Sequence, residues 1–198
     1  MYKILYVMGL PDTKFVSIEE YLDAERIALE KHEYYQGEIY AMSGASLPHN
    51  IIFRNVFIEL GVKLKGKTCQ PFSSDLRIHV PKNSLFTYPD ISIICGKPET
   101  LDETFDTVVN PSVIIEILSK STRDYDKGQK FTLYRDIESL QEYVLIDSQE
   151  IRIEKYKRNK DDSWLLTEYK SLEDQFIIET IQEEFGLEEI YLDALASK

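Results

Sequence analysis

The segment Pro111-Ser-Val-Ile-Ile-Glu-Ile-Leu-Ser119 contains the most apolar run of the chain, interrupted by a single acid, Glu116. A second compact run rich in β-branched residues, Asp90-Ile-Ser-Ile-Ile-Cys95, follows Pro89. Runs this apolar are typical of strands covered on both faces, as in a sheet that lies between helices. The two segments therefore predict neighbouring strands in the core of one sheet.

The flanking segments show helix and strand patterns in turn. Ser17-Ile-Glu-Glu20 has the form of a capping box, which predicts a helix to about Glu30. Apolar residues recur every four positions from Ile52 to Leu64, which predicts a helix to about Lys65 that is closed by Gly66. Further expected elements are a hairpin over 33–42 turning at Gln36-Gly37, strands over 75–80, 142–147, 151–156 and 164–169, a helix over 123–137, and a helix or a turn and a helix in the acidic tail, 179–195. This order predicts an α/β fold around one mixed sheet, in a single domain over residues 1–198.

The chain of 198 residues is acidic, with 23 Lys and Arg against 35 Asp and Glu and a formal net charge of −12. Proteins that hold nucleic acid mainly by neutralising phosphates are basic, so this balance disfavours indiscriminate tight binding to a polyanion. It allows a small basic cleft within an acidic surface.

Cysteine content and hydropathy indicate the compartment. Cys69 and Cys95 match neither a zinc spacing nor a disulfide framework, so we expect a reducing cytoplasm. No apolar run approaches the ~20 residues that a membrane span needs, and residues 1–10 lack the basic flank and cleavage site of a signal peptide. We expect a soluble cytoplasmic protein without a membrane partner.

Glu116 is the first candidate for chemistry because Ile114, Glu116 and Leu118 share one face of the expected strand. An ionised carboxylate on an apolar face is costly to bury unless a cation or hydrogen-bond donors compensate it. A functional carboxylate and a paired structural one both meet that condition. Asp90, which opens the other strand, is the second candidate.

The expected helix over 123–137 carries two lysines in one stripe with aromatic residues. Lys127, Lys130, Phe131 and Tyr134 are spaced i, i+3, i+4 and i+7. Such lysines either lie along the apolar surface with their charge in water or point inward toward carboxylates. The connection from Glu116 is short, which favours an inward lysine.

Two carboxylates and a lysine are the parts needed for phosphodiester hydrolysis. Carboxylate oxygens hold hard divalent cations, with water in the remaining positions. The cation lowers the pKa of a bound water and stabilises charge on a phosphoryl oxygen, while a lysine orients the nucleophile or adds positive charge.

Several short motifs occur in a distinctive order and spacing. They are Glu33-Tyr-Tyr-Gln-Gly-Glu-Ile39, His49-Asn-Ile51, Ser74-Asp-Leu-Arg77, Pro89-Asp-Ile-Ser-Ile93, Pro111–Ser119, then Ser121, Asp124, Lys130 and Tyr134, and Glu142-Tyr-Val-Leu-Ile-Asp147. Over about residues 15–160 the chain therefore resembles the Uma-type family of restriction endonucleases, within the PD-(D/E)xK nuclease superfamily. The resemblance implies a restriction-endonuclease-like fold with a central mixed β-sheet flanked by α-helices, DNA as substrate, and Mg²⁺ or Mn²⁺ as cofactor.

The chain departs from the wider nuclease motif at one position. The lysine of (D/E)xK should stand at position 118, which is Leu118. The Uma-type pattern places a lysine on the following helix instead, and Lys130 matches it, with Lys127 as a rival. Because the chemistry needs an ammonium group at the right place rather than a particular backbone origin, this substitution is physically reasonable.

Three further residues are secondary candidates. Glu33 matches the family's N-terminal acid and either approaches the metal or is a surface hairpin carboxylate. His49 matches the family's histidine and either contacts phosphate or a bound water or makes a structural hydrogen bond. Asp75 either lines the cleft or caps a turn. Ser119 and Ser121 lack an evident base, which favours capping over nucleophilic roles.

We therefore expect a metal-dependent endonuclease acting on DNA, in which Asp90 and Glu116 bind Mg²⁺, Lys130 assists the nucleophilic water and Glu33 completes the site. Two alternatives stay open: a non-catalytic binding or assembly module on the same fold, and a metal hydrolase for a smaller phosphate substrate. A homodimer is a further expectation. The residues expected to supply a basic cleft are Lys63, Lys65, Lys67, Arg77 and Arg123.

Overall fold

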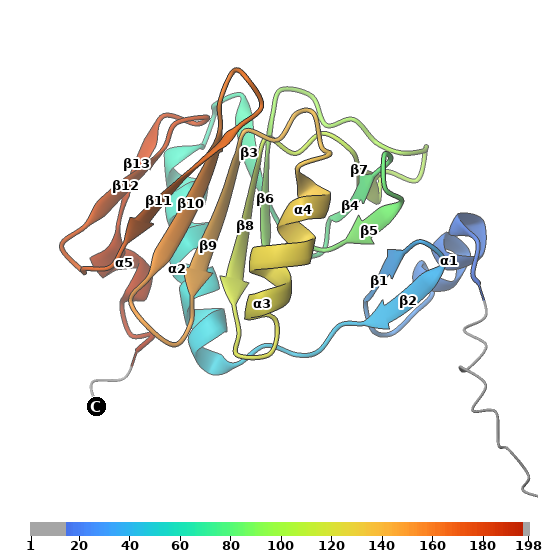
Figure 1. Ribbon diagram of the computed structural model, residues 1–198, viewed down its shortest axis with the longest axis horizontal. Coiled ribbons are helices and arrows are strands. Elements are labelled where there is room, and N and C mark those ends of the chain that lie inside the picture. Colours follow the sequence, from blue (N-terminus) through green and yellow to red (C-terminus); the bar gives the residue numbers. More distant parts are fainter. Residues whose placement is uncertain (1–14, 196–198) are drawn as a thin grey trace, which may run out of the picture.

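The computed structural model describes residues 15–195 (Figure 1), so the expectation about a signal peptide at residues 1–10 lies outside the described residues. The helices are α1 (Ile18–Glu25), α2 (Leu47–Lys63), α3 (Arg123–Tyr125), the π-helix η1 (Asp126–Lys130), α4 (Phe131–Tyr134) and α5 (Leu187–Tyr191). The strands are β1 (His32–Tyr35), β2 (Glu38–Ala41), β3 (Cys69–Ser73), β4 (Arg77–Val80), β5 (Leu85–Thr87), β6 (Ile91–Cys95), β7 (Thr107–Val108), β8 (Val113–Leu118), β9 (Glu142–Asp147), β10 (Ile153–Arg158), β11 (Trp164–Tyr169), β12 (Gln175–Ile178) and β13 (Glu183–Gly186).

A six-stranded mixed sheet forms the centre of the molecule, in the order β11-β10-β9-β8-β6-β3. Strands β8 and β9 run parallel, and the other neighbours in this sheet run antiparallel. The apolar runs 91–95 and 113–118 form β6 and β8, which pair directly. The prediction of an α/β fold with a central mixed sheet is thus confirmed.

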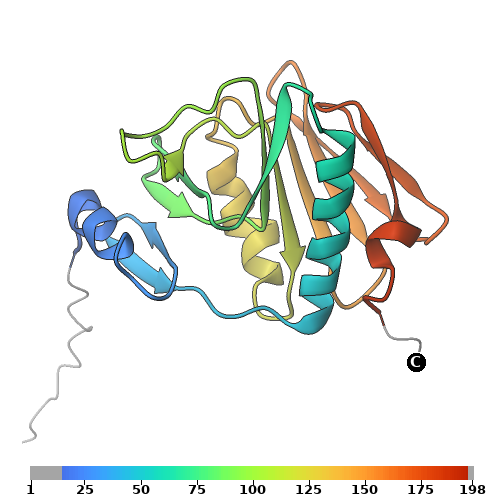
Figure 2. The same cartoon turned by 180° about the vertical axis from the view of Figure 1, so that it is seen from behind.

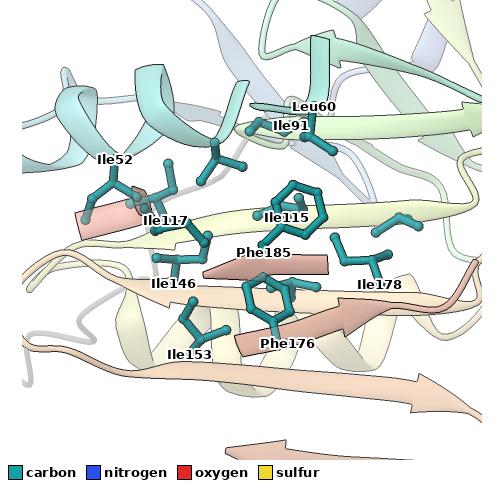
Figure 3. Packing of buried hydrophobic residues seen from close by; sticks show 14 of the residues in the cluster. Ile52, Leu60, Ile91, Ile115, Ile117, Ile146, Ile153, Phe176, Ile178 and Phe185 are labelled. Carbon is teal, nitrogen blue, oxygen red and sulfur yellow. The ribbon is translucent and has the colours of Figure 1, made fainter. Parts of the chain in front are cut away.

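Helices cover both faces of this sheet. In Figure 1, α3 and α4 lie on the near side of the sheet, beside β8, and in Figure 2 α2 lies on the opposite face. Alternate residues of β8 divide between the two layers: Ile115 and Ile117 pack with Ile52 and Leu60 of α2 (Figure 3), whereas Ile114 packs in the cluster that includes α4. Because side chains alternate along a strand, Glu116 faces the α4 side, between Ile114 and Leu118 of the cluster that includes α4.

A smaller sheet, in the order β2-β1-β5-β4-β7, lies beside the central one. The hairpin β1–β2 turns at Gln36 and Gly37, whose φ angles of 48° and 93° are both positive. A two-residue turn with two positive φ angles suits the twist of a hairpin, and glycine adopts that conformation without strain. The predicted hairpin and its turn are confirmed.

Several element boundaries differ from the expectations. The first helix ends at Glu25 rather than near Glu30, and the helix expected over 123–137 is divided into α3, η1 and α4. The acidic tail, 179–195, contains the strand β13, which pairs with β12 just before the tail, and its helix is the short α5. Hairpin pairing in the tail depends on a partner strand in space, which a helix-like pattern of apolar residues does not reveal.

The expectation of unpaired cysteines is wrong. Cys69 and Cys95 form a disulfide between β3 and β6, where the antiparallel register places them directly opposite each other. Spacing along the chain does not report such a register, so the cysteines no longer support a reducing compartment. Among residues 15–195, no helix is both long enough and apolar enough to cross a membrane.

Candidate active site

Asp90 and Glu116 meet at the junction of β6 and β8. Ile91 pairs with Ile115, so Asp90, one residue before β6, stands opposite Glu116. The Asp90 Oδ2 atom accepts a hydrogen bond from the Ile117 amide at 2.7 Å, and Glu116 Oε2 accepts one from the Asp90 amide at 3.3 Å. The two carboxylates therefore face the same side of the sheet, as expected, while their role as metal ligands stays a prediction.

Both acids line a small cavity of about 120 Å³. The connection from β2 to α2 contributes residues 42–45 to its wall, and in Figure 1 this connection passes near the arrowhead of β8 and α3. The other lining residues include His49, Tyr88, Thr122, Asp126 and Lys130. The cavity brings together side chains from the β6–β8 junction, from α2 and from the helix that follows β8.

Glu116 is buried, and its Oε1 atom contacts two side chains. Its Oε1 atom accepts a hydrogen bond from the Tyr134 hydroxyl at 2.9 Å and lies 2.9 Å from Lys130 Nζ. Burial raises the pKa of Glu116 above its usual range, and the nearby acids Asp126 and Asp90 add to the rise, whereas Lys130 opposes it. The positive charge of Lys130 therefore offsets much of the cost of burying the Glu116 carboxylate.

Lys130 lies at the centre of three acids. Its Nζ atom is 2.9 Å from Glu116, 3.1 Å from Glu33 and 3.8 Å from Asp126. Burial lowers the pKa of Lys130, but the charges of Glu116 and Glu33 outweigh this effect and raise it well above its usual value. Lys130 thus remains a cation inside the protein.

The backbone around Lys130 is a single turn of π-helix, η1. Such turns are rare and occur often at functional sites, because the wider turn re-aims the side chains that follow it. This geometry divides the expected continuous helix and delivers Lys130 to the acids. No feature of the residue spacing predicted it.

Glu33 reaches the same cluster from β1. Its Oε1 atom accepts a hydrogen bond from Thr87 Oγ1 of β5 at 2.5 Å and pairs with Lys130. The side chain is only 12% exposed, so it is not a free surface carboxylate of the hairpin.

His49 lies in the first turn of α2, which begins after Ser46; the Ser46 hydroxyl accepts a hydrogen bond from the His49 amide. Its Nε2 atom is 3.1 Å from Asp90 Oδ2. Its Nδ1 atom is buried and has no hydrogen-bond partner. The histidine therefore contacts the same carboxylate oxygen that the Ile117 amide holds.

The remaining predicted candidates lie elsewhere. Lys127 Nζ pairs with Glu154 at 2.6 Å, and Asp75 pairs with Lys31 at 2.6 Å on the surface, with its side chain 84% exposed. Neither lines the cavity.

The residues expected to form a basic cleft are mostly bound to acids. Lys63 pairs with Glu59, Lys67 with Glu183, Arg77 with Asp106, and Arg123 with Asp147. Among the described residues that line the cavity, Lys130 and His49 are the basic ones.

Asp126 is a member of the cluster that sequence reasoning missed. It is buried, lines the cavity, and its burial raises its pKa, which the charge of Lys130 opposes. Its position four residues before Lys130 was a usable signal, since such pairs face each other on a helix. Tyr134 was placed in the helical stripe, but its hydrogen bond to Glu116 was not foreseen.

The donor atoms at this site suit a hard cation. Within residues 15–195, no group of three or more His, Cys, Asp or Glu side chains is arranged to hold a metal ion. Mg²⁺, however, is commonly bound through one or two carboxylates, with waters and substrate phosphates as its other ligands. Asp90 and Glu116, adjacent and facing one cavity, fit that mode of binding.

Similarity to known proteins extends over most of the chain. Residues 18–190 match the model of the Uma2 family, described as "Putative restriction endonuclease". Two similar proteins from Synechocystis sp. are each named an uncharacterized protein: sll1609, 40% identical over 162 residues (82% of this chain and 92% of that one), and slr1290, 36% identical over 176 residues (89% and 91%).

A solved structure shares the fold. It is the crystal structure of "a putative nuclease belonging to DUF820" from Anabaena variabilis, with a TM-score of 0.75 and 16% sequence identity. The match covers 91% of this chain and 99% of that chain. At this identity the likeness shows the fold alone.

Proposed function

The chain belongs to the Uma2 family, whose description reads "Putative restriction endonuclease", and we propose that it is a divalent-metal-dependent endonuclease that hydrolyses phosphodiester bonds in DNA. The observation that carries this proposal is the meeting of Asp90, Glu116 and Lys130 at one cavity. These residues come from two strands and a helix, and their convergence supplies both a cation site and a fixed positive charge.

Asp90 and Glu116 are the proposed ligands of Mg²⁺ or Mn²⁺. When bound, the cation supplies a water of lowered pKa and stabilises negative charge on the phosphoryl oxygen. The Ile117 amide and His49 hold Asp90 Oδ2 in place, and Tyr134 and Lys130 hold Glu116 Oε1. Each carboxylate is thereby oriented before substrate arrives, which lowers the cost of assembling the site.

Lys130 is the side chain proposed to supply a positive charge to the reaction, in addition to the metal ion. Its ammonium group is charged and nearly buried, so it orients the attacking water and offsets the charge that develops on the phosphate. Glu33 of β1, hydrogen-bonded to Thr87, positions Lys130 through its ion pair with the ammonium group. Lys127, paired with Glu154, has no part in this proposal.

The first test is cleavage of duplex, single-stranded and branched DNA in the presence of Mg²⁺ or Mn²⁺. We expect Asp90→Asn and Glu116→Gln to lose about 10²-fold or more of the cleavage rate. Asp75→Asn is the matched control because it removes an acid outside the cavity, and it should cleave as the wild type does.

The second test is calorimetric titration of Mn²⁺ into the same proteins. Wild-type affinity in the Asp90→Asn and Glu116→Gln variants would contradict the metal site. A protein that neither binds the metal nor cleaves DNA would instead support the non-catalytic module, in which Glu116 serves only to pair Lys130 and Asp90 only to contact His49 and the Ile117 amide. Competition by free nucleotides, without cleavage of DNA, would support the hydrolase for a smaller phosphate substrate.

A further inference from the structure

A second cavity adjoins the candidate active site and is lined by aromatic residues. It has a volume of about 380 Å³ and is bounded by Tyr35, Tyr40 and Tyr125 together with Glu33, Ser121, Thr122 and Gln129. We call it the tyrosine pocket. Thr122 lines both cavities, and Glu33 of the tyrosine pocket pairs with Lys130 of the active-site cavity. The two cavities are therefore neighbours, with Thr122 in both walls and the Glu33–Lys130 ion pair between them.

The register of the hairpin places two of the tyrosines. Glu33 pairs with Tyr40 and Tyr35 pairs with Glu38 across β1 and β2. Residues directly opposite in an antiparallel pair, and residues two apart on a strand, project from the same face. Tyr35 and Tyr40 consequently project from the same face of the hairpin as Glu33. That face therefore carries both the acid that pairs with Lys130 and two tyrosine rings.

The helix after β8 supplies the third tyrosine. Tyr125 immediately precedes η1, and its ring centroid lies 5.9 Å from Lys130 Nζ. The turn of π-helix thus places Tyr125 beside the ammonium group proposed to act on the phosphate. Aromatic rings from the hairpin and from the helix border one pocket beside the proposed point of reaction.

Because the protein is negatively charged, affinity for DNA must come largely from contacts other than phosphate neutralisation. The net charge is −12, and the basic residues Lys63, Lys67, Arg77 and Arg123 pair with acids. Stacking of bases on aromatic side chains supplies affinity of about 1–3 kcal/mol per base, and it does not require a basic surface. Tyr40 is 48% exposed, so its ring is accessible for such a contact.

Resting on the proposed nuclease function, we propose that the tyrosine pocket binds an unstacked base of the DNA substrate next to the phosphate that is cleaved. The base stacks against the tyrosine rings, and Ser121, Thr122 and Gln129 offer hydrogen bonds to its polar edge. The pocket volume falls within the roughly 300–1,000 Å³ that is common for small-ligand sites. The protein should therefore prefer DNA with an unpaired nucleotide over a perfect duplex.

Binding without cleavage tests this directly, in buffer that contains a metal chelator. Short DNA strands, single-stranded or with one unpaired nucleotide in a duplex, carry the fluorescent base 2-aminopurine at successive positions. We expect quenching of the fluorescence at one position, and affinity about ten-fold lower when the base at that position is absent. Equal affinity for the intact and abasic strands would overturn the proposal.

Substitutions in the hairpin assign the effect to the tyrosines. Tyr35→Ala and Tyr40→Ala should each weaken binding of the intact strand and abolish the penalty for the missing base, whereas Tyr40→Phe should retain both. Ile39→Ala is the matched control because Ile39 pairs with Tyr34 and projects from the other face of the hairpin. A penalty that persists unchanged in the two alanine variants, with circular dichroism showing folded protein, would refute the assignment.

The two proposals fail separately. Position-specific quenching that depends on Tyr40, in a protein that cleaves no DNA with Mg²⁺ or Mn²⁺, would retain the base pocket and reject the nuclease. Cleavage that is lost in Glu116→Gln but is indifferent to Tyr40→Ala and to the missing base would retain the nuclease and reject the pocket.

Discussion

At the scale of single residues, the stability of the site depends on one buried cation. Lys130 is 5% exposed and faces Glu116, Glu33 and Asp126, all within 4 Å. Burying charges is costly, and the cost is recovered only when each charge retains its partners. Removing the lysine leaves three acids without their common counter-ion. Removing one acid leaves Lys130 paired with the other two acids.

We therefore expect Lys130→Met to destabilise the fold by about 3–5 kcal/mol. Lys127→Met is the matched control on the same helical segment: Lys127 is partly exposed and its partner Glu154 also contacts Arg152, so the expected loss is about 1 kcal/mol. The measurement is the free energy of unfolding in urea. Equal losses in the two variants would contradict the central role given to Lys130.

At the scale of elements, pairing between β6 and its neighbours holds the proposed ligands in place. Strand β6 pairs with β8 on one side and with β3 on the other, and Asp90 immediately precedes it. The disulfide joins the β3 end of this arrangement at Cys69 and Cys95. A cross-link between paired strands restricts the unfolded chain and so favours the pairing of β3 with β6, the strand that Asp90 precedes.

The disulfide closes a loop with a sequence separation of 26, for which chain entropy gives a stabilisation of about 3.5 kcal/mol. A reducing agent should lower the thermal unfolding midpoint of the wild type by a corresponding amount. The variant with Cys69→Ser and Cys95→Ser should unfold at the lower temperature with or without the reducing agent. A wild type that is indifferent to reduction, with two free thiols by titration, would show that the bond does not form in solution.

At the scale of the whole molecule, charge limits how DNA is held. The formal net charge is −12, and the cavity wall offers only Lys130 and His49 as basic side chains among the described lining residues. Few phosphates can be neutralised at once, so counter-ion release contributes little to affinity. A homodimer would present a longer surface to duplex DNA, and this remains a prediction that light scattering can test.

We expect the affinity for DNA to depend only weakly on salt. The slope of log affinity against log salt concentration should be about −1 to −3, compared with about −10 for a repressor that grips many phosphates. Fluorescence anisotropy over a range of NaCl concentrations measures this slope. A steep slope would mean that an extended basic surface forms when the protein dimerises. It would contradict the proposal that base stacking supplies most of the affinity for DNA.

Local sequence by itself determined the elements that carry the site. The apolar runs of β6 and β8, the hairpin turn at Gln36-Gly37 and the capping box before α1 are properties of neighbouring residues, so they could be read directly. The burial of Glu116 was also predictable, because an acid that interrupts an apolar face of a core strand has no other place to go.

Only the tertiary structure decided which side chains meet. One turn of π-helix directs Lys130 to the acids of the site and Lys127 away from them. Asp126 and Tyr134 join the site because that helical segment packs against β8. The pairing of Cys69 with Cys95 depends on the register of β3 and β6. The packing of the helix and the strand register are relations between separate elements, and no pattern in the residue spacing predicted the π-helical turn. Local patterns report the conformation of a segment, but the position of one segment against another is set by the packing of the whole core.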